Sequence, residues 1–291
     1  MFKPFFDFKS IEIDSKTYKI EQKFGADMKF LEEVYGLIGA NAKFSCIYCE
    51  ANLKKKWQDG DQNLNFPINR SLARAAQYHQ EEQFGYKNPS IMHIDFKNIV
   101  IDTLHLLLRM SERLIDALIL IINSNDIDSE SCDFGKRKNL EIFYSILSEK
   151  CNITKPYYKS IVNNKEKINL KSLNGTEIEK IFEYFSKNSL KTIYAPLFVN
   201  SIKVDEIVKF SDCFDEFYNL YIQIKTYNSI PYKKVDLKDL DRRLRNWLAS
   251  FIPFISTSES SITPYAHVFV YHTKELLELH GNINLYNLQG K

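Results

Sequence analysis

The chain lacks several features that would assign it to a protein class at once. Its longest purely apolar run, Ala117–Ile122, is far shorter than the roughly 18 residues that a membrane-spanning helix needs. The first residues lack the pattern of a secretory signal peptide. The five cysteines are an odd number, which argues against a disulfide framework. We therefore expect an intracellular protein, nuclear or cytoplasmic, with no membrane partner.

A strong net charge is also missing. The 291 residues carry a formal charge of +2, whereas dedicated nucleic-acid-binding domains are often strongly basic. Two stretches are locally basic, Lys54–Lys56 and 233–245, and a solvated surface explains both. Charge alone therefore neither supports nor excludes DNA as a partner. The apolar fraction of 44% and the charged fraction of 26% are those of an ordinary globular protein.

Apolar periodicity predicts a helix-rich α+β fold with its strands near the N-terminus. Alternating residues predict a hairpin of strands 11–14 and 17–24, followed by a helix from Met28 to about Ile38 that Asp27 caps. A strand at 99–102 leads directly into a very apolar helix, 103–123, which must be buried on more than one face.

The remaining segments are expected to be mostly helical. The best candidate ranges are 70–86, 140–147, 177–185, 204–224 and 237–251. In the last segment, Thr263 as N-cap and Pro264 at the first helical position predict a helix that stops near Gly281.

The clearest chemical motif is the pair Cys46 and Cys49 with two residues between them. This spacing lets two thiolates on one tight turn hold a single metal ion. Thiol–disulfide chemistry uses the same spacing, but usually in a thioredoxin-like context that is missing here. Two cysteines buried by chance are the remaining alternative.

A second pair, His267 and His272, matches the three-to-five-residue spacing of zinc-binding histidines. Positions five apart point away from each other on a regular helix, so both can reach one ion only if the helix begins or distorts between them. Together the two pairs supply the four ligands of a closed, structural Cys2His2 zinc site. Four further histidines are alternative ligands: His79, His93, His105 and His280.

Asp102 follows the predicted strand 99–102 and starts the apolar helix. Catalytic groups collect at strand C-termini, and phosphoryl transfer on DNA uses carboxylates to hold two metal ions. Asp102 is therefore a candidate catalytic residue and divalent-metal ligand, although an N-cap role explains it equally well.

These pieces occur in an order that resembles the central part of the V(D)J recombinase catalytic subunit and its DDE transposase relatives. The similarity lies in four segments: 18–31 with 44–49, 99–102 with its helix, 168–175, and 266–282. It implies an incomplete RNase H-like core at 1–124, a large all-helical insertion at 125–262, and a zinc-ligand helix at 263–291 that returns to the core. It also implies that Cys46, Cys49, His267 and His272 bind zinc and that Asp102 is the second catalytic carboxylate.

The other two carboxylates of that family do not map onto this sequence. The first Asp should precede the hairpin, where Asp7 is a poor candidate, and the final Glu should follow Gly290. The resemblance therefore leads us to expect a truncated or degenerate transposase-like protein that binds structural zinc and DNA but lacks strand-transfer activity.

Two alternatives stay open. One is an active nuclease or transposase, dependent on Mg²⁺ or Mn²⁺, that uses Asp27, Asp95 or Glu21 as substitute carboxylates. The other is a helical protein-interaction module with no catalytic role. A homodimer is compatible with each of them, and we expect no small-molecule cofactor. Whether the chain is an enzyme is left open by the sequence.

Overall fold

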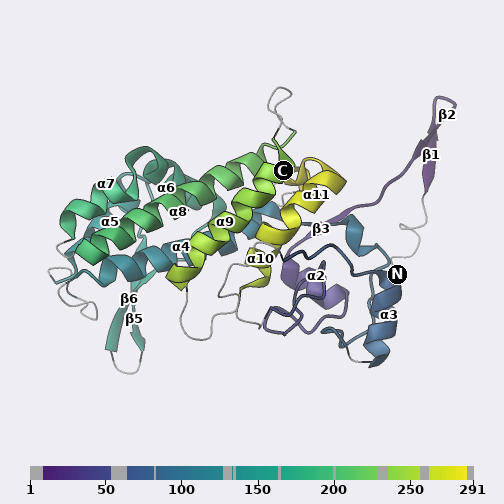
Figure 1. Ribbon diagram of the computed structural model, residues 1–291, viewed down its shortest axis with the longest axis horizontal. Coiled ribbons are helices and arrows are strands. Elements are labelled where there is room, and N and C mark those ends of the chain that lie inside the picture. The colour runs from purple at the N-terminus through teal and green to yellow at the C-terminus, as the bar shows by residue number, and fades with distance from the viewer. Residues whose placement is uncertain are drawn as a thin grey trace. The chain divides into compact units, whose positions relative to one another are not determined.

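The N-terminal strands belong to two separate pairs in the computed structural model of the protein. It describes residues 9–53, 64–81, 83–126, 133, 136–162, 165–198, 201–228, 235–255 and 262–286. Strands β1 (Ser10–Ile13) and β2 (Lys16–Lys19) form an exposed antiparallel hairpin. Strand β3 (Phe24–Ala26), labelled in Figure 1, instead pairs in parallel with the buried strand β4 (Ile99–Ile101). The predicted single strand 17–24 is therefore wrong, because alternation does not reveal that the chain changes partner before Phe24.

Helix α2 (Met28–Val34) follows β3, and Asp27 caps it by accepting a hydrogen bond from the Lys29 backbone amide at 2.8 Å. It ends four residues earlier than predicted. Gly36 adopts a φ of +75°, and a Cβ there would lie 2.0 Å from the Asn88 carbonyl oxygen. Close packing of a distant loop thus ends the helix and requires glycine.

The helices mostly occupy the predicted ranges. Helix α4 (Thr103–Asn123) matches its prediction at both ends, the helices expected at 70–86, 140–147, 177–185, 204–224 and 237–251 differ from theirs by up to five residues, and a short helix at 190–194 was not predicted. Their bounds are α3 (Leu72–Glu81), α4 (Thr103–Asn123), α5 (Lys138–Glu149), α6 (Gly175–Asn188), α7 (Leu190–Tyr194), α8 (Ser201–Lys225) and α9 (Leu237–Ile255), with short 3₁₀ turns at Phe96–Asn98, Ala195–Leu197 and Ile283–Tyr286. Among the described residues, no helix combines the length and apolar character needed to cross a membrane.

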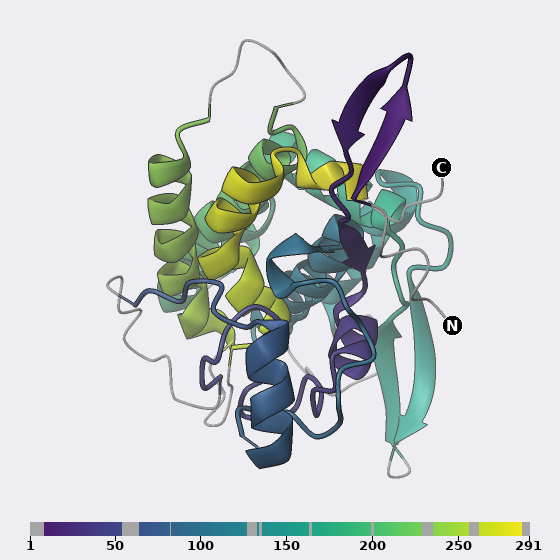
Figure 2. The same cartoon turned by 90° about the vertical axis from the view of Figure 1, so that its right-hand side faces the viewer.

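A β-hairpin interrupts the region that we expected to be all-helical. Strands β5 (Tyr157–Val162) and β6 (Lys165–Leu170) form an antiparallel pair that extends away from the neighbouring helices (Figure 2). The prediction of an all-helical insertion is therefore wrong. Strand β5 carries aromatic and β-branched residues that favour extended structure, whereas β6 contributes only Ile168, and Asn163-Asn164 separate the two in the sequence.

The chain divides into two compact units. The first contains 1–106, 223–246 and 258–291, and the second contains 107–222 and 247–257. In the second unit, aromatic side chains from α6, α8 and α9 form much of the core, including Phe182, Phe214 and Trp247. The ranges 1–124, 125–262 and 263–291 remain predictions about family architecture, which this division does not test.

In the first unit, the core surrounds the β3–β4 pair. The Tyr35 hydroxyl donates to the Ile94 carbonyl at 2.7 Å, and the Tyr48 hydroxyl donates to the Ile99 carbonyl at 3.3 Å. Both tyrosines are buried. The first bond ties the end of α2 to the segment before β4, and the second ties the Cys46–Cys49 loop to β4 itself.

Candidate metal centre

The Cys46–Cys49 loop is a tight turn shaped by bonds to sulfur. The Tyr48 amide donates to Cys46 Sγ at 3.3 Å, and the Ala51 backbone makes a hydrogen bond to the Cys49 thiol. Hydrogen bonds from backbone amides to sulfur stabilise thiolates, which are the metal-binding form of cysteine. The local backbone therefore suits two thiolate ligands.

The side chain of Arg70 makes hydrogen bonds to the backbone of this turn. Its Nε donates to the carbonyls of Cys46 and Cys49, at 2.8 and 3.0 Å, and its Nη2 donates to those of Phe44 and Phe84. The guanidinium is buried and lies over the Tyr86 ring, 4.8 Å from its centroid. The guanidinium thus joins four backbone carbonyls, and its Nε fixes the two residues that carry the thiols.

The histidines lie on a distorted helix. Helix α10 (Pro264–His267) begins at Thr263, whose side chain accepts from the Ala266 amide, and it continues as a π-helix, Val268–His272, and then as α11 (Thr273–His280). A π-helix bonds residues five apart, so it brings positions 267 and 272 toward one side. This is the distortion that a five-residue spacing requires. Gly281, with a φ of +67°, ends the helix as predicted.

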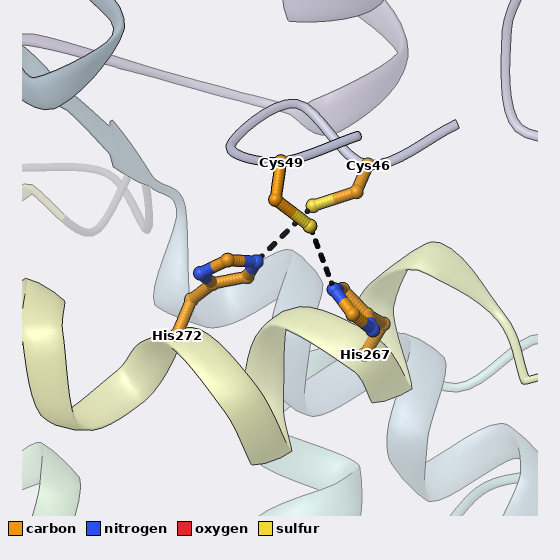
Figure 3. Close-up of side chains that lie close together, drawn as sticks. All are labelled: Cys46, Cys49, His267 and His272. Atoms are coloured by element: carbon orange, nitrogen blue, oxygen red, sulfur yellow. Dashed lines mark hydrogen bonds between the residues drawn. The ribbon is translucent and has the colours of Figure 1, made fainter. Parts of the chain in front are cut away.

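All four predicted ligands meet at one buried point (Figure 3). One donor atom from each residue lies within 4.8 Å of the others, and the four residues are 0–1% exposed. Cys46 Sγ is 3.4 Å from His272 Nε2, and Cys49 Sγ is 3.2 Å from His267 Nε2. A tetrahedral zinc ion with ordinary bond lengths separates sulfur and nitrogen ligands by about 3.6 Å. The group could therefore hold a structural zinc ion.

The electrostatics of the group also fit a cation. Burial raises the pKa of the Cys46 thiol, but the bond with Cys49 and the nearby imidazoles outweigh it and hold this pKa well below its ordinary value. Burial, and then the neighbouring Cys46, raise the pKa of Cys49. Two buried thiolates repel each other, so a cation between them is what would allow both to deprotonate. Burial lowers the pKa of His267, which favours the neutral imidazole that binds metals.

The four alternative histidines lie outside this group. His105 contacts Asp102, and His280 lies beside Tyr286, with ring centroids 6.4 Å apart. His79 and His93 are likewise not among the clustered ligands. Of the six histidines and five cysteines, the four that the sequence proposed as zinc ligands are the ones that the structure brings together.

Asp102 is a helix cap in this structure. Its Oδ1 accepts from the Leu104 amide at 3.0 Å, its Oδ2 contacts His105 Nδ1, and the residue is fully buried. The N-cap interpretation is thus confirmed, while a catalytic or metal-binding role stays a prediction. Among the substitute carboxylates, Asp95 caps the turn at Phe96–Asn98, and Glu21 pairs with Lys23 at 3.9 Å.

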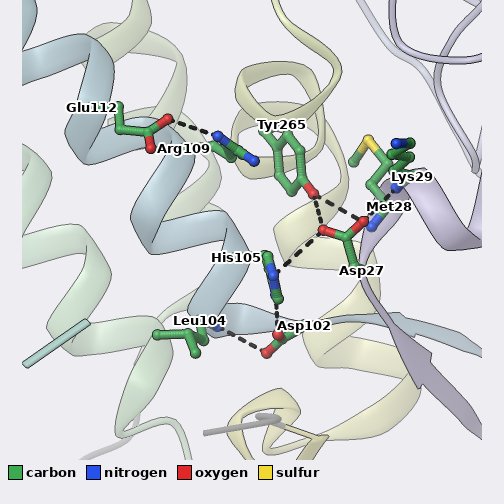
Figure 4. A network of polar contacts seen from close by, with 9 residues as sticks. All are labelled: Asp27, Met28, Lys29, Asp102, Leu104, His105, Arg109, Glu112 and Tyr265. Carbon is green, nitrogen blue, oxygen red and sulfur yellow. Dashed lines mark hydrogen bonds and ion pairs between the residues drawn. The ribbon is translucent and has the colours of Figure 1, made fainter. Parts of the chain in front are cut away.

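Asp27 is the carboxylate that comes close to Asp102. The parallel register pairs Ala26 with Ile101, so the two aspartates follow the C-terminal ends of neighbouring strands. Figure 4 shows His105 between them: its Nε2 lies 3.6 Å from Asp27 Oδ2. Tyr265, two residues before His267, donates to the same oxygen at 2.8 Å. This network links the segment bearing His267 to the strand ends.

Sequence reasoning missed Arg70 and Tyr265. Each acts through contacts with residues far away in the chain, and neither belongs to a local motif. Compared with known proteins, the chain matches no protein-family model, and no curated protein is similar enough in sequence to count as a relative.

Proposed function

We propose that one structural zinc ion joins the Cys46–Cys49 turn to the π-helix that carries His267 and His272. The observation that carries this proposal is the burial of four protein donors around one point, 0–1% exposed. Four protein ligands leave no position open for water or substrate, which is the arrangement of structural rather than catalytic zinc.

This zinc closes a very long loop. Cys49 and His267 are 218 positions apart, so the ion ties together segments that the sequence separates by most of its length. Binding energy at such a site contributes directly to folding, because the ligands meet only in the folded chain. Loss of the zinc is therefore expected to lower the melting temperature of the protein.

The metal content of the purified protein tests this function. Wild type is expected to contain one zinc per chain, and Cys46→Ser to lose both the zinc and thermal stability. Cys151→Ser is the matched control, since Cys151 is also buried but lies outside the cluster. Zinc-free wild type, or a fully metallated Cys46→Ser protein, would refute the site and favour an unrelated helical interaction module.

For the wider role, we propose a degenerate DDE transposase-like protein that keeps a DNA-binding surface. The support is that the sequence segments occur in the same order as in the DDE transposase family, and that the parallel strands β3 and β4 are each followed by an aspartate, Asp27 and Asp102. An incomplete RNase H-like core is the architecture that this resemblance implies. Strand transfer is not expected, because both oxygens of the buried Asp102 already contact protein groups, Leu104 N and His105 Nδ1.

The proximity of Asp27 to Asp102 favours one alternative, an active nuclease dependent on Mg²⁺ or Mn²⁺. An assay for nicking of supercoiled plasmid distinguishes the degenerate protein from the active nuclease. The degenerate protein leaves the plasmid intact with either ion. Metal-dependent nicking that disappears in Asp27→Asn would establish the alternative.

A further inference from the structure

One face of helix α8 lines an open groove in the second compact unit. The groove has a volume of about 850 Å³, and the C-terminal end of α9, with Pro253 and Phe254, forms its other wall. The residues that α8 contributes follow the alternating three- and four-residue spacing of a single helix stripe: Ile202, Asp205, Lys209, Asp212 and Glu216. From the first to the last of them the stripe is about 21 Å long, close to four helical turns.

The walls of the groove are apolar in part and fixed to each other. The Phe254 ring lies edge-on to the buried Phe210 ring, with centroids 5.1 Å apart. Trp247 Nε1 donates to the Cys213 carbonyl at 3.1 Å, which ties α9 to α8. Cys213, Pro253 and Phe254 all line the groove. Because these contacts hold the two helices together, the groove is formed in advance, and a ligand would lose little free energy in ordering it.

An exposed aliphatic side chain extends the apolar surface. Ile202, in the first turn of α8, lines the groove and is 72% exposed. A large apolar side chain at such a position contributes little to the core of the protein, and its burial under a partner would be favourable. The aliphatic stems of Lys203 and Lys209 belong to the same wall. The groove therefore suits a ligand with an apolar surface.

The rim of the groove is acidic. Its lining contains two lysines and four carboxylates: Asp205, Glu206, Asp212 and Glu216. Four negative and two positive charges leave a formal charge of −2, whereas the whole chain carries +2. Asp215, next to the rim, lies in the same negative field, because burial and then the charge of Asp212 raise the pKa of this carboxyl to about 6. The rim would therefore attract a cationic ligand.

Two of the rim carboxylates already form ion pairs within the protein. Glu206 pairs with Lys203 at 2.9 Å, and Asp212 pairs with Lys191 at 3.0 Å. Both pairs are accessible to solvent, where such pairs contribute little, so they leave the attraction for a cation largely in place.

We propose that this groove binds a basic amphipathic helix of a partner protein, whose apolar side chains cover Ile202 and Phe254 and whose basic side chains face the acidic rim. The length of the groove favours a helix over a small ligand, since side chains three and four residues apart on a partner helix would match the α8 stripe turn by turn. The acidic rim favours a basic helix and repels an acidic one. The lining residues belong to the second unit and the four candidate zinc ligands to the first, so this inference is independent of the zinc site.

A synthetic peptide of about 18 residues tests the proposal on the full chain. It carries leucine at every third or fourth position and lysine elsewhere, which gives a basic amphipathic helix about 27 Å long. Anisotropy of the fluorescent peptide is expected to show saturable binding to wild type that weakens as salt rises. Two comparison peptides should bind at least about tenfold more weakly, one with glutamate in place of lysine and one of the same composition with its leucines spread around the helix.

Removal of charge from the groove tests the acidic rim. Asp205→Asn/Glu216→Gln is expected to bind the lysine peptide about tenfold more weakly at low salt and to lose most of the salt dependence. Glu149→Gln/Glu183→Gln is the matched control, because it removes the same charge from exposed positions of the second unit outside the groove. The control should bind like wild type.

Removal of apolar surface tests the contact with Ile202. Ile202→Ser is expected to bind the peptide about fivefold more weakly. Leu120→Ser is the control, since Leu120 is 63% exposed, belongs to the same unit and does not line the groove. Melting temperature and zinc content are compared for every variant. The three peptides still test the proposal on wild type if a variant does not fold.

The proposal is overturned if wild type does not bind the lysine peptide, if it binds all three peptides equally, or if groove and control variants lose the same affinity. A wild-type dimer that Ile202→Ser converts to a monomer would show that a second copy of the chain occupies the groove instead. If phenylethylamine bound with a dependence on Asp205 and Glu216 while the peptide did not, the groove would belong to a small apolar amine. A zinc-free wild type that binds the peptide would refute the zinc site alone.

Discussion

The proposed zinc site depends on a side chain that belongs to no sequence motif. Arg70 Nε donates to the carbonyls of both candidate ligand cysteines while its Nη2 donates to those of Phe44 and Phe84, and the planar guanidinium holds these four carbonyls in one fixed geometry. We predict that Arg70→Lys, which keeps the charge but loses this geometry, weakens zinc binding about tenfold. Competition with a chromophoric chelator measures the affinity. Arg74→Lys, at an exposed position a short distance along the chain, should bind zinc like wild type; equal affinities for both variants would contradict the role of Arg70.

Glu32 makes stability depend on pH. Burial, and then the charges of Asp27 and Cys46, raise the pKa of this carboxyl to about 7 from an ordinary value of 4.5. The folded chain therefore keeps a proton that the unfolded chain loses, so stability falls as pH rises from about 4.5 to 7. Glu32→Gln should remove this penalty and stabilise the protein by about 1–2 kcal/mol at pH 8, after allowance for solvent screening.

Urea unfolding of Glu32→Gln and wild type at pH 5 and pH 8 measures the effect. Zinc affinity also changes with pH, so the relevant quantity is the difference between the two proteins at each pH. Glu33→Gln, on the exposed side of the same helix, is the control and should leave the pH dependence unchanged. A constant difference between Glu32→Gln and wild type at both pH values would refute the assignment.

At the scale of elements, the π-helix determines whether His267 and His272 can both reach one metal ion. The Thr273 hydroxyl donates to the Phe269 carbonyl at 2.7 Å, inside the widened turn where the regular bonding pattern changes. Thr273→Val keeps the shape of the side chain but leaves this buried carbonyl without that donor. We predict a loss of about 1–3 kcal/mol in unfolding free energy and weaker zinc binding.

Chemical unfolding and chelator competition together measure the consequences of Thr273→Val. Thr192→Val, on the exposed side of α7, is the control and should change neither quantity. If the Thr273 variant lost stability but kept full zinc affinity, the hydroxyl would matter for the helix and not for the alignment of His267 with His272.

Helices were easier to predict than strands for a physical reason. The apolar period of α4 and the caps at Asp27, Thr263 and Gly281 are local signals, and the structure follows them. Strand pairing is a relation between distant segments. The parallel partnership of β3 with β4 spans most of the first hundred residues, so alternation around Phe24 could not reveal it.

At the scale of the whole molecule, the cluster of candidate ligands was predictable because metal binding depends on residue types and spacings that the sequence shows directly. Two cysteines and two histidines at ligand spacings were sufficient to name Cys46, Cys49, His267 and His272, although 218 positions separate Cys49 from His267. The residues that surround these four side chains were not predictable from the sequence. Arg70, Tyr265 and the partnership of Asp27 with Asp102 arise only when the chain folds, because each joins segments with no shared pattern.

X-ray absorption at the zinc edge of the purified protein tests the central claim most directly. A structural zinc held by these four side chains predicts two sulfur neighbours at about 2.3 Å and two nitrogen neighbours at about 2.0–2.1 Å, with no bound water. Zinc surrounded only by nitrogen and oxygen, or a fifth water ligand, would contradict the closed Cys2His2 site and the long-range connection that depends on it.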